Sequence, residues 1–286
     1  MDLHFTEHNN STLLSITNTL VKTLDLIGNK AVARPFSEKK LLKHALLDLC
    51  KQIYANLYAI KTLLAEFHDE RNNLKRVPIA LITRGAIADC LTGVYLITFR
   101  NSDESLKNEI DVMSREYAKF LRFFEDEKIR YLQKFETLEA EEELKKWESN
   151  FKNSHPQLFV NKEDTEWRLK SAKSLRSTSE IKLSKELDGN LTEEKKAKRI
   201  KRNDKNEDYG LLYVGFKYFS QYQHYSFSNR KMIEDLREEF FGILLMSIAS
   251  IATTTSLFSS ILGGEGNEDE IKRNYESINL LFETLE

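Results

Sequence analysis

The stretch IALITRGAIADCLTGVYLITFR, residues 79–100, decides the fold class of this chain. It is almost entirely apolar, and the small residues Gly85, Ala88 and Gly93 recur along it. Small side chains let a second backbone approach closely, so we predict the central and most buried helix of a bundle here. Pro78 precedes the stretch and is expected in the first turn of that helix, where a missing N–H does no harm.

The segments on either side also show helical periodicity. Residues 11–27 and 42–67 place apolar side chains at steps of three and four, which is typical of a helix with one buried face. Gly28 and Asn29 are residues that commonly follow a helix, so the first helix is expected to end there. These segments indicate neighbours for the central helix in a multi-helix bundle.

A second apolar run, FFGILLMSIASIATTTSLFSSIL, spans residues 240–262 and is 23 residues long, enough to cross a bilayer. Eight of its residues are Ser or Thr, and no cluster of Lys or Arg with an aromatic belt flanks it. We therefore interpret it as a buried core helix that ends at Gly263 and Gly264, in preference to a membrane span.

The chain is predicted to be all-α, a multi-helix bundle with long helices and a charged, partly ordered insertion. Only 3 prolines and 10 glycines interrupt its 286 residues, and 31% of them are charged. One long amphipathic helix is expected over 105–150. Residues 153–206 lack sustained periodicity, so we predict one discontinuous domain made of 1–152 and 207–286, with 153–206 as a basic insertion or linker.

The cysteine content and the first residues favour a cytoplasmic protein. Cys50 and Cys90 lie in apolar helical patterns, where a free thiol behaves as a small hydrophobic side chain. The spacing of Cys and His matches no zinc site, and MDLHFTEHNN, residues 1–10, has neither part of a secretory signal. We expect no metal, no cofactor and no membrane association.

Arg84 and Asp89 are the charged residues inside the apolar stretch before Arg100. Their spacing turns them about 140° apart around a helix, so they cannot pair with each other locally. A buried charge needs a partner, so each is expected to find one on another element. Arg84 is either part of a binding or catalytic site or a structural link between helices, and Asp89 is a candidate binding residue.

The segment YFSQYQHYS, residues 218–226, places Ser220 and His224 one helical turn apart. A hydroxyl beside an imidazole can serve as an activated nucleophile or a proton relay, and Arg84 could hold an anionic group such as phosphate. Arg84, Ser220 and His224 are therefore candidate catalytic residues, with Tyr218 and Tyr222 as binding residues. The same side chains could instead form a satisfied polar network inside the core.

Positive charge is concentrated between Arg168 and Lys205, a segment that contains 13 Lys and Arg residues and 6 Asp and Glu residues. Such a run could contact the phosphates of RNA or of a nucleotide through counterion release. It could equally be a solvated connector between helices. The candidate phosphate contacts are Lys195, Lys196, Lys198, Arg199, Lys201 and Arg202.

ITRGAIADCLTGVYL together with YFSQYQHYS resembles a widespread family of bacterial all-helical proteins of unknown function, loosely grouped with the HEPN-like domains. The family's hallmarks are an Arg on one core helix and a Ser-x-x-x-His pair on another, matched here by Arg84 and by Ser220 with His224. The resemblance covers 37–100 and 207–262. Ribonuclease members of the wider group carry Arg four to six residues before His, whereas this chain has Ser220 in that place.

Two functions follow from these observations. The first is a helical binding or interaction protein, with a homodimer as one form and, as the resemblance implies, a role in bacterial stress or phage defence. The second is a metal-independent HEPN-like ribonuclease or phosphotransfer enzyme that acts on RNA, with His224 as acid and base and Arg84 stabilising phosphate charge.

Overall fold

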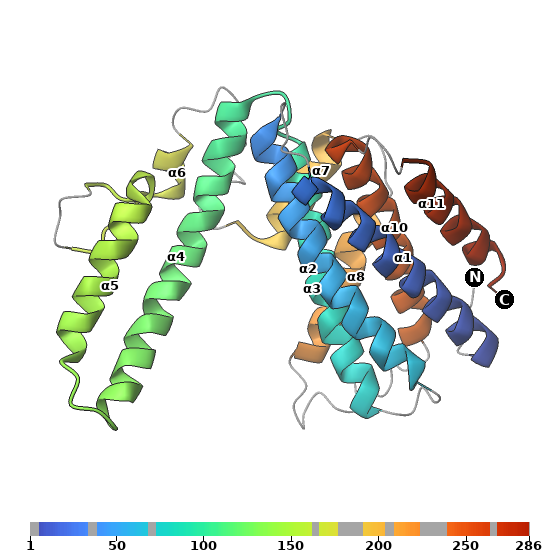
Figure 1. The fold of residues 1–286 in the computed structure, drawn as a ribbon, viewed down its shortest axis with the longest axis horizontal. Coiled ribbons are helices and arrows are strands. Elements are labelled where there is room, and N and C mark those ends of the chain that lie inside the picture. Colours follow the sequence, from blue (N-terminus) through green and yellow to red (C-terminus); the bar gives the residue numbers. More distant parts are fainter. Residues whose placement is uncertain are drawn as a thin grey trace. The chain divides into compact units, whose positions relative to one another are not determined.

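The structure is a computed structural model that describes residues 6–33, 39–67, 73–161, 166–176, 191–203, 209–223, 239–263 and 268–285. Within these ranges the regular structure is helical apart from one isolated bridge between Phe159 and Leu169 (Figure 1). The predicted all-α class is confirmed. Three helices exceed 25 residues, which agrees with the low content of proline and glycine: α1 (Glu7–Ala33), α2 (Lys40–Ala65) and α4 (Asp103–Gln133).

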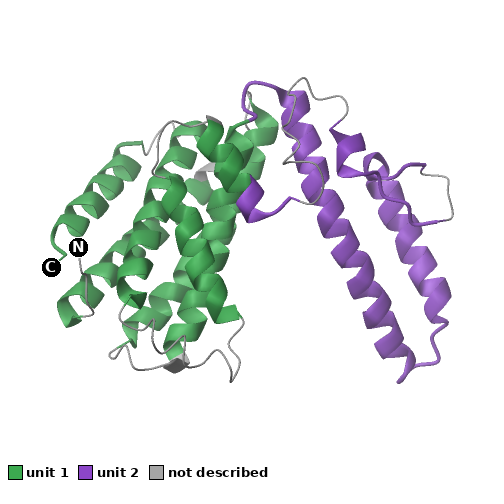
Figure 2. Cartoon of the chain, turned by 180° about the vertical axis from the view of Figure 1, so that it is seen from behind, with its two compact units in different colours: residues 1–98, 196–286 green, residues 99–195 purple. Residues whose placement is uncertain are grey.

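The chain divides into two compact units (Figure 2). Unit 1 consists of residues 1–98 and 196–286, and unit 2 of residues 99–195. These boundaries differ from the predicted ones at 152 and 206, because α4 packs on helices of unit 2 and does not belong to the bundle. The interruption of unit 1 is therefore a folded unit with its own long helices.

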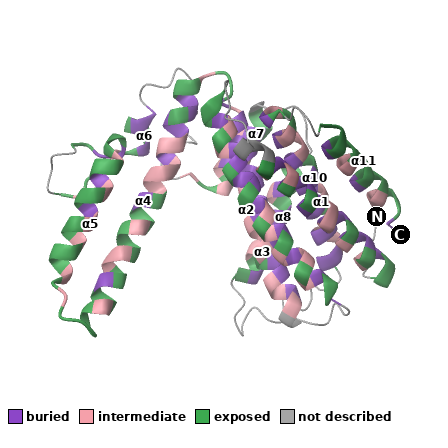
Figure 3. Ribbon diagram, viewed as in Figure 1, coloured by how far each residue is buried: buried purple, intermediate pink, exposed green. Residues whose placement is uncertain are grey.

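Unit 1 is a bundle arranged around α3 (Asn73–Ile97). This helix packs against α2, α8 (Gly210–Gln223) and α10 (Phe240–Leu262), while α1 packs against α2 and α11 (Glu268–Glu283). Every residue of α3 from Cys90 to its end is buried (Figure 3). The apolar stretch quoted first is thus the middle of the bundle.

Close packing of α3 on α10 depends on a glycine. A Cβ atom added at Gly93 would lie 2.1 Å from Cζ of Phe258, whose ring is fully buried. The ring tip therefore rests directly on the backbone of α3, as the small residues of that stretch predicted. Cys50 and Cys90 are free and buried in the same core, which confirms their interpretation as small hydrophobic residues.

Three predicted helix boundaries are wrong. The first helix continues past Gly28 to Ala33, since a glycine inside a helix costs only about 1 kcal/mol and the buried Leu24 and Ile27 precede it on the same helix. Helix α3 begins at Asn73, a full turn before Pro78. The helix predicted over 105–150 is in fact two helices, α4 and α5 (Ala140–Ser154). The break could not be predicted, because the apolar stripe continues across the connection and the connection contains neither glycine nor proline.

Unit 2 has a small aromatic core and a buried ion pair. Trp167 stacks on Trp147 with ring centroids 5.4 Å apart and meets Phe159 edge to face at 4.9 Å. Arg176, which follows the short helix α6 (Ala172–Leu175), donates from Nε and Nη2 to the two carboxylate oxygens of Glu109 on α4 at 2.6 and 2.9 Å. Both tryptophans of the chain lie in unit 2, so tryptophan fluorescence reports on this unit alone.

One exposed face of α4 carries a row of aromatic side chains. Tyr117, Phe120 and Phe124 follow one another with ring centroids 6.2 Å apart at each step, and all three are exposed. Tyr131 and Phe135 extend the row with centroids 5.1 Å apart. The periodicity predicted helical structure here, but in this part of α4 it does not mark a buried face.

Two helices are long and apolar enough to cross a membrane by length and composition, one over Lys75–Ile97 and the other α10. More than half of the apolar window of each is buried in the structure. A core helix of a bundle and a membrane span both meet this criterion, so the interpretation of α10 as a core helix stays a prediction.

Candidate functional site

The predicted site residues Arg84 and Ser220 meet where α3 packs on α8. The Nε of Arg84 donates to Oγ of Ser220 at 3.0 Å, and its guanidinium carbon lies 4.7 Å from the ring centroid of Phe216. The hydroxyl of Ser220 in turn donates to the carbonyl oxygen of Phe216 at 2.6 Å. Arg84 is therefore held from one side by a hydroxyl and across its plane by an aromatic ring.

These contacts use the Ser220 hydroxyl in two ways. It accepts from Arg84 and gives its only proton to the backbone of its own helix. A serine nucleophile needs that proton to be taken by a base, so this arrangement positions Arg84 and does not activate Ser220. Arg84 is only partly buried, and its terminal nitrogens make no other hydrogen bond with the residues that the structure describes.

The rest of YFSQYQHYS divides at the end of α8. His224 lies outside the described residues. Tyr222 is buried and Tyr218 partly buried, with their ring centroids 5.9 Å apart. Burial raises the pKa of both phenols, which are consequently neutral near pH 7.

Arg76 is a residue of this interface that the sequence analysis missed. It lies in the first turn of α3 and is fully buried, with its guanidinium carbon 5.9 Å from the ring centroid of Phe240. Its charge lowers the pKa of Tyr222 against the effect of burial, so the two side chains are near neighbours. The sequence signal was present, but the misplaced start of the helix at Pro78 left Arg76 outside it.

Asp89 occupies a separate position on α3. Its Oδ2 accepts from Nδ2 of Asn56 on α2 at 3.3 Å. Burial raises the pKa of Asp89 to about 7, and the positive charge of Lys196 partly opposes this. The structure thus pairs Arg84 with α8 and Asp89 with α2, on different sides of α3, as their spacing predicted.

The raised pKa of Asp89 makes the stability of the protein depend on pH. The folded state binds this proton more tightly than the unfolded state, whose carboxyl has a pKa near 3.8. The stabilising contribution of Asp89 is thus complete below pH 3.8 and lost as the pH rises through 7. Between pH 5 and pH 8 we expect the wild-type free energy of unfolding to fall on the order of 2 kcal/mol more than that of Asp89→Asn.

Denaturant unfolding of both proteins at pH 5 and pH 8 measures this difference. Asp48→Asn serves as the matched control, because Asp48 also lies on a helix of unit 1 but is largely exposed. It should keep the wild-type pH dependence. Equal pH dependence of wild type and Asp89→Asn would show that Asp89 titrates normally.

The six candidate phosphate contacts of the predicted insertion lie on α7 (Glu193–Asn203). Lys196 is buried and donates to Oγ1 of Thr92 at 2.9 Å, and Nε of Arg199 donates to Oγ1 of Thr98 at 3.0 Å. These two side chains connect α7 to Thr92 on α3 and to Thr98 just after its end. The exposed members of the predicted set are Lys198, Lys201 and Arg202, and Lys195 is partly buried.

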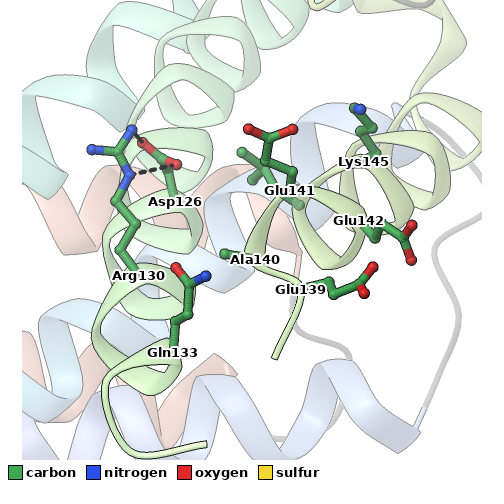
Figure 4. Close-up of a pocket in the computed structure, with 9 residues that line it drawn as sticks. Asp126, Arg130, Gln133, Glu139, Ala140, Glu141, Glu142 and Lys145 are labelled. Atoms are coloured by element: carbon green, nitrogen blue, oxygen red, sulfur yellow. Dashed lines mark hydrogen bonds and ion pairs between the residues drawn. The ribbon is translucent and has the colours of Figure 1, made fainter. Parts of the chain in front are cut away.

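A cleft of about 570 Å³ lies in unit 2 between α4 and the start of α5 (Figure 4). Its arginine, Arg130, is already paired with Asp126 at 3.1 Å. The other charged groups on its wall are mainly the exposed carboxylates of Glu139, Glu141 and Glu142. None of the residues that line this cleft has a buried polar atom without a partner. The cleft is therefore a weaker candidate site than the interface of α3 and α8.

No family model, no curated protein and no solved structure matches this chain. The HEPN-like resemblance therefore stays an expectation from the sequence. Among the residues that the structure describes, no group of three or more His, Cys, Asp and Glu side chains is arranged to hold a metal ion.

Proposed function

We propose that this protein is a helical binding module that recognises a phosphate-bearing ligand, RNA or a nucleotide, through Arg84 without cleaving it. The observation that carries the proposal is the orientation of the Arg84 guanidinium. Ser220 holds its Nε and Phe216 covers its face, which leaves the two terminal nitrogens as the donating edge. A guanidinium presents this edge to two oxygens of one phosphate group.

Binding without turnover follows from the state of Ser220. Its proton is committed to the Phe216 carbonyl, so the hydroxyl aligns Arg84 and is not poised for attack. The enzyme alternative would require His224, or another base, to compete for that proton. The exposed part of the basic set on α7 adds general attraction for phosphates, which strengthens binding without selecting a ligand.

The binding test uses fluorescence anisotropy with a labelled nucleoside triphosphate and a short labelled RNA. We expect Arg84→Ala to weaken binding of the preferred probe by tenfold or more, about 1.4 kcal/mol, because a charge-assisted pair is lost. Ser220→Ala should weaken it less, by about threefold (~0.65 kcal/mol), because Arg84 remains but is no longer aligned. Lys217→Ala removes an exposed charge from the same helix α8 and is the matched control.

The same proteins are incubated with a mixed RNA pool to test for cleavage. No cleavage above buffer is expected from wild type. Cleavage that disappears in Arg84→Ala and His224→Ala would establish the ribonuclease alternative and overturn the proposal. Equal binding by wild type and Arg84→Ala would remove Arg84 from the site, provided that circular dichroism shows both to be folded.

A further inference from the structure

The guanidinium of Arg76 is a buried cation with no carboxylate at hydrogen-bond distance among the residues that the structure describes. Its side chain is fully buried, and Nε, Nη1 and Nη2 all lack a hydrogen-bond partner in the described structure. Arginine keeps its charge at any pH relevant to proteins, so it cannot escape this cost by losing a proton. A buried charge is normally paired or hydrogen-bonded, and the described residues give Arg76 neither kind of partner.

A second buried polar group, the hydroxyl of Tyr222, lies beside Arg76. The hydroxyl of Tyr222 is buried and meets no acceptor with good hydrogen-bond geometry among the described residues, although Tyr218 lies close enough to lower its pKa. The ring of Tyr222 lies 5.8 Å from that of Phe240, the aromatic ring over which Arg76 sits. One cation with several N–H donors and one hydroxyl are thus enclosed together among aromatic side chains.

Aromatic rings offset only part of the cost of burying the cation. A guanidinium over the face of Phe240 gains a modest attraction, but the ring offers no acceptor to the N–H groups. The missing complement must carry negative charge and at least two acceptor oxygens, since the guanidinium presents its donors in a fork. Carboxylates and phosphates have this chemistry, whereas a chloride ion has a single centre.

The N-terminal end of α3 also favours a bound anion near Arg76. Arg76 belongs to the first turn of this 25-residue helix, where backbone N–H groups carry partial positive charge. An anion bound there meets the helix end as well as the side chains. Arg84 lies eight residues further along α3, about 12 Å away, so this position is separate from the proposed ligand site.

We propose that Arg76 and Tyr222 form an enclosed site for a small oxyanion, a carboxylate or a phosphate. The bound oxyanion supplies the hydrogen-bonded counter-charge that the described residues of α3, α8 and α10 do not give to Arg76. The ligand is a buried part of the folded protein, and its removal leaves the bundle with an unpaired charge. This proposal stands independently of the function of Arg84.

The test measures the thermal unfolding temperature, Tm, in phosphate, in acetate and in chloride at matched ionic strength and pH 7. Wild type is expected to gain Tm with rising phosphate or acetate relative to chloride, since a ligand that binds only the folded state stabilises it. A larger rise in phosphate identifies a phosphate group as the ligand, and a larger rise in acetate identifies a carboxylate. Equilibrium dialysis with labelled phosphate or acetate should give one bound anion per chain.

Three variants make the test specific. Arg76→Met should lose the anion-dependent rise and have a higher Tm than wild type in chloride, because the unpaired charge is gone. Tyr222→Phe keeps the ring and should weaken anion binding by about threefold (~0.65 kcal/mol) through the loss of one hydroxyl. Lys75→Met removes the neighbouring, partly exposed cation on α3 and should respond to anions as wild type does.

Two outcomes would overturn the proposal. One is a wild-type Tm that is the same in all three salts together with a lower Tm for Arg76→Met, which would mean that a carboxylate of the chain itself pairs with Arg76. The other is an equal anion response of wild type, Lys75→Met and Tyr222→Phe, which would place any binding elsewhere. If Arg76→Met does not fold, dialysis with wild type and Tyr222→Phe decides the question.

Discussion

Glu109→Ala is expected to unfold unit 2 at denaturant concentrations that leave unit 1 helical. The substitution leaves the Arg176 guanidinium buried without its bidentate partner, and both side chains are at least 94% buried in the wild type. Breaking a buried ion pair from one side costs about 3–5 kcal/mol. Within its described residues, unit 2 has small apolar clusters around Val112 and Phe159 to compensate. Tryptophan fluorescence follows unit 2, while far-UV circular dichroism is dominated by the helices of unit 1.

A control and a double variant separate the pair from general charge effects. Glu166→Gln breaks a pair with Arg168 in which both side chains are more than 60% exposed, and it should cost less than about 1 kcal/mol. Glu109→Leu combined with Arg176→Met removes both charges and should recover most of the stability lost in Glu109→Ala. A single variant as stable as Glu166→Gln would mean that the pair contributes nothing.

Gly93→Ala is expected to destabilise unit 1 by about 3 kcal/mol, although alanine is the better helix former. The new methyl group would lie within 2.8 Å of three ring atoms of Phe258. The ring is enclosed on all sides, so α10 must shift away from α3 to make room. Urea unfolding followed by far-UV circular dichroism measures the effect.

Gly28→Ala is the matched control for this substitution. Gly28 also lies inside a helix, but a Cβ atom there would meet nothing within 4 Å. Alanine should therefore raise the free energy of unfolding by up to about 1 kcal/mol. Combining Gly93→Ala with Phe258→Leu should recover stability. A stabilising Gly93→Ala would mean that α3 and α10 are not in close contact.

The helices could be predicted from the sequence because periodicity is a local signal. The apolar steps of α2 and the composition of α3 indicated how each would pack, and Gly263 marks the end of α10 with φ of 65°. Boundaries were less predictable, since Gly28 continues a helix that buried neighbours support. The division into units was missed because α4 has the same apolar rhythm as a bundle helix, yet its partners follow it in the chain.

The site was only partly predictable. Arg84 and Ser220 are 136 residues apart, and the resemblance to a family pattern suggested them as partners; the structure gives their hydrogen bond. The direction of the Ser220 proton could not be predicted, because it depends on the rotamer that reaches the Phe216 carbonyl. Lys196 and Arg199 look like solvated charges in the sequence, and only the packing of α7 on α3 turns them towards threonines.

The hydrogen bond between Thr98 and Arg199 has a consequence for how the chain can vary. Thr98 is the last residue of unit 1 before unit 2, and Arg199 follows shortly after the chain returns. The bundle therefore needs only a short bridge between these points, and closing a short loop costs little entropy. In the order of the chain, all of unit 2 is therefore an insertion between two neighbouring points of unit 1. Insertions, deletions or the exchange of unit 2 for another domain with adjacent ends should leave the α3–α8 interface intact.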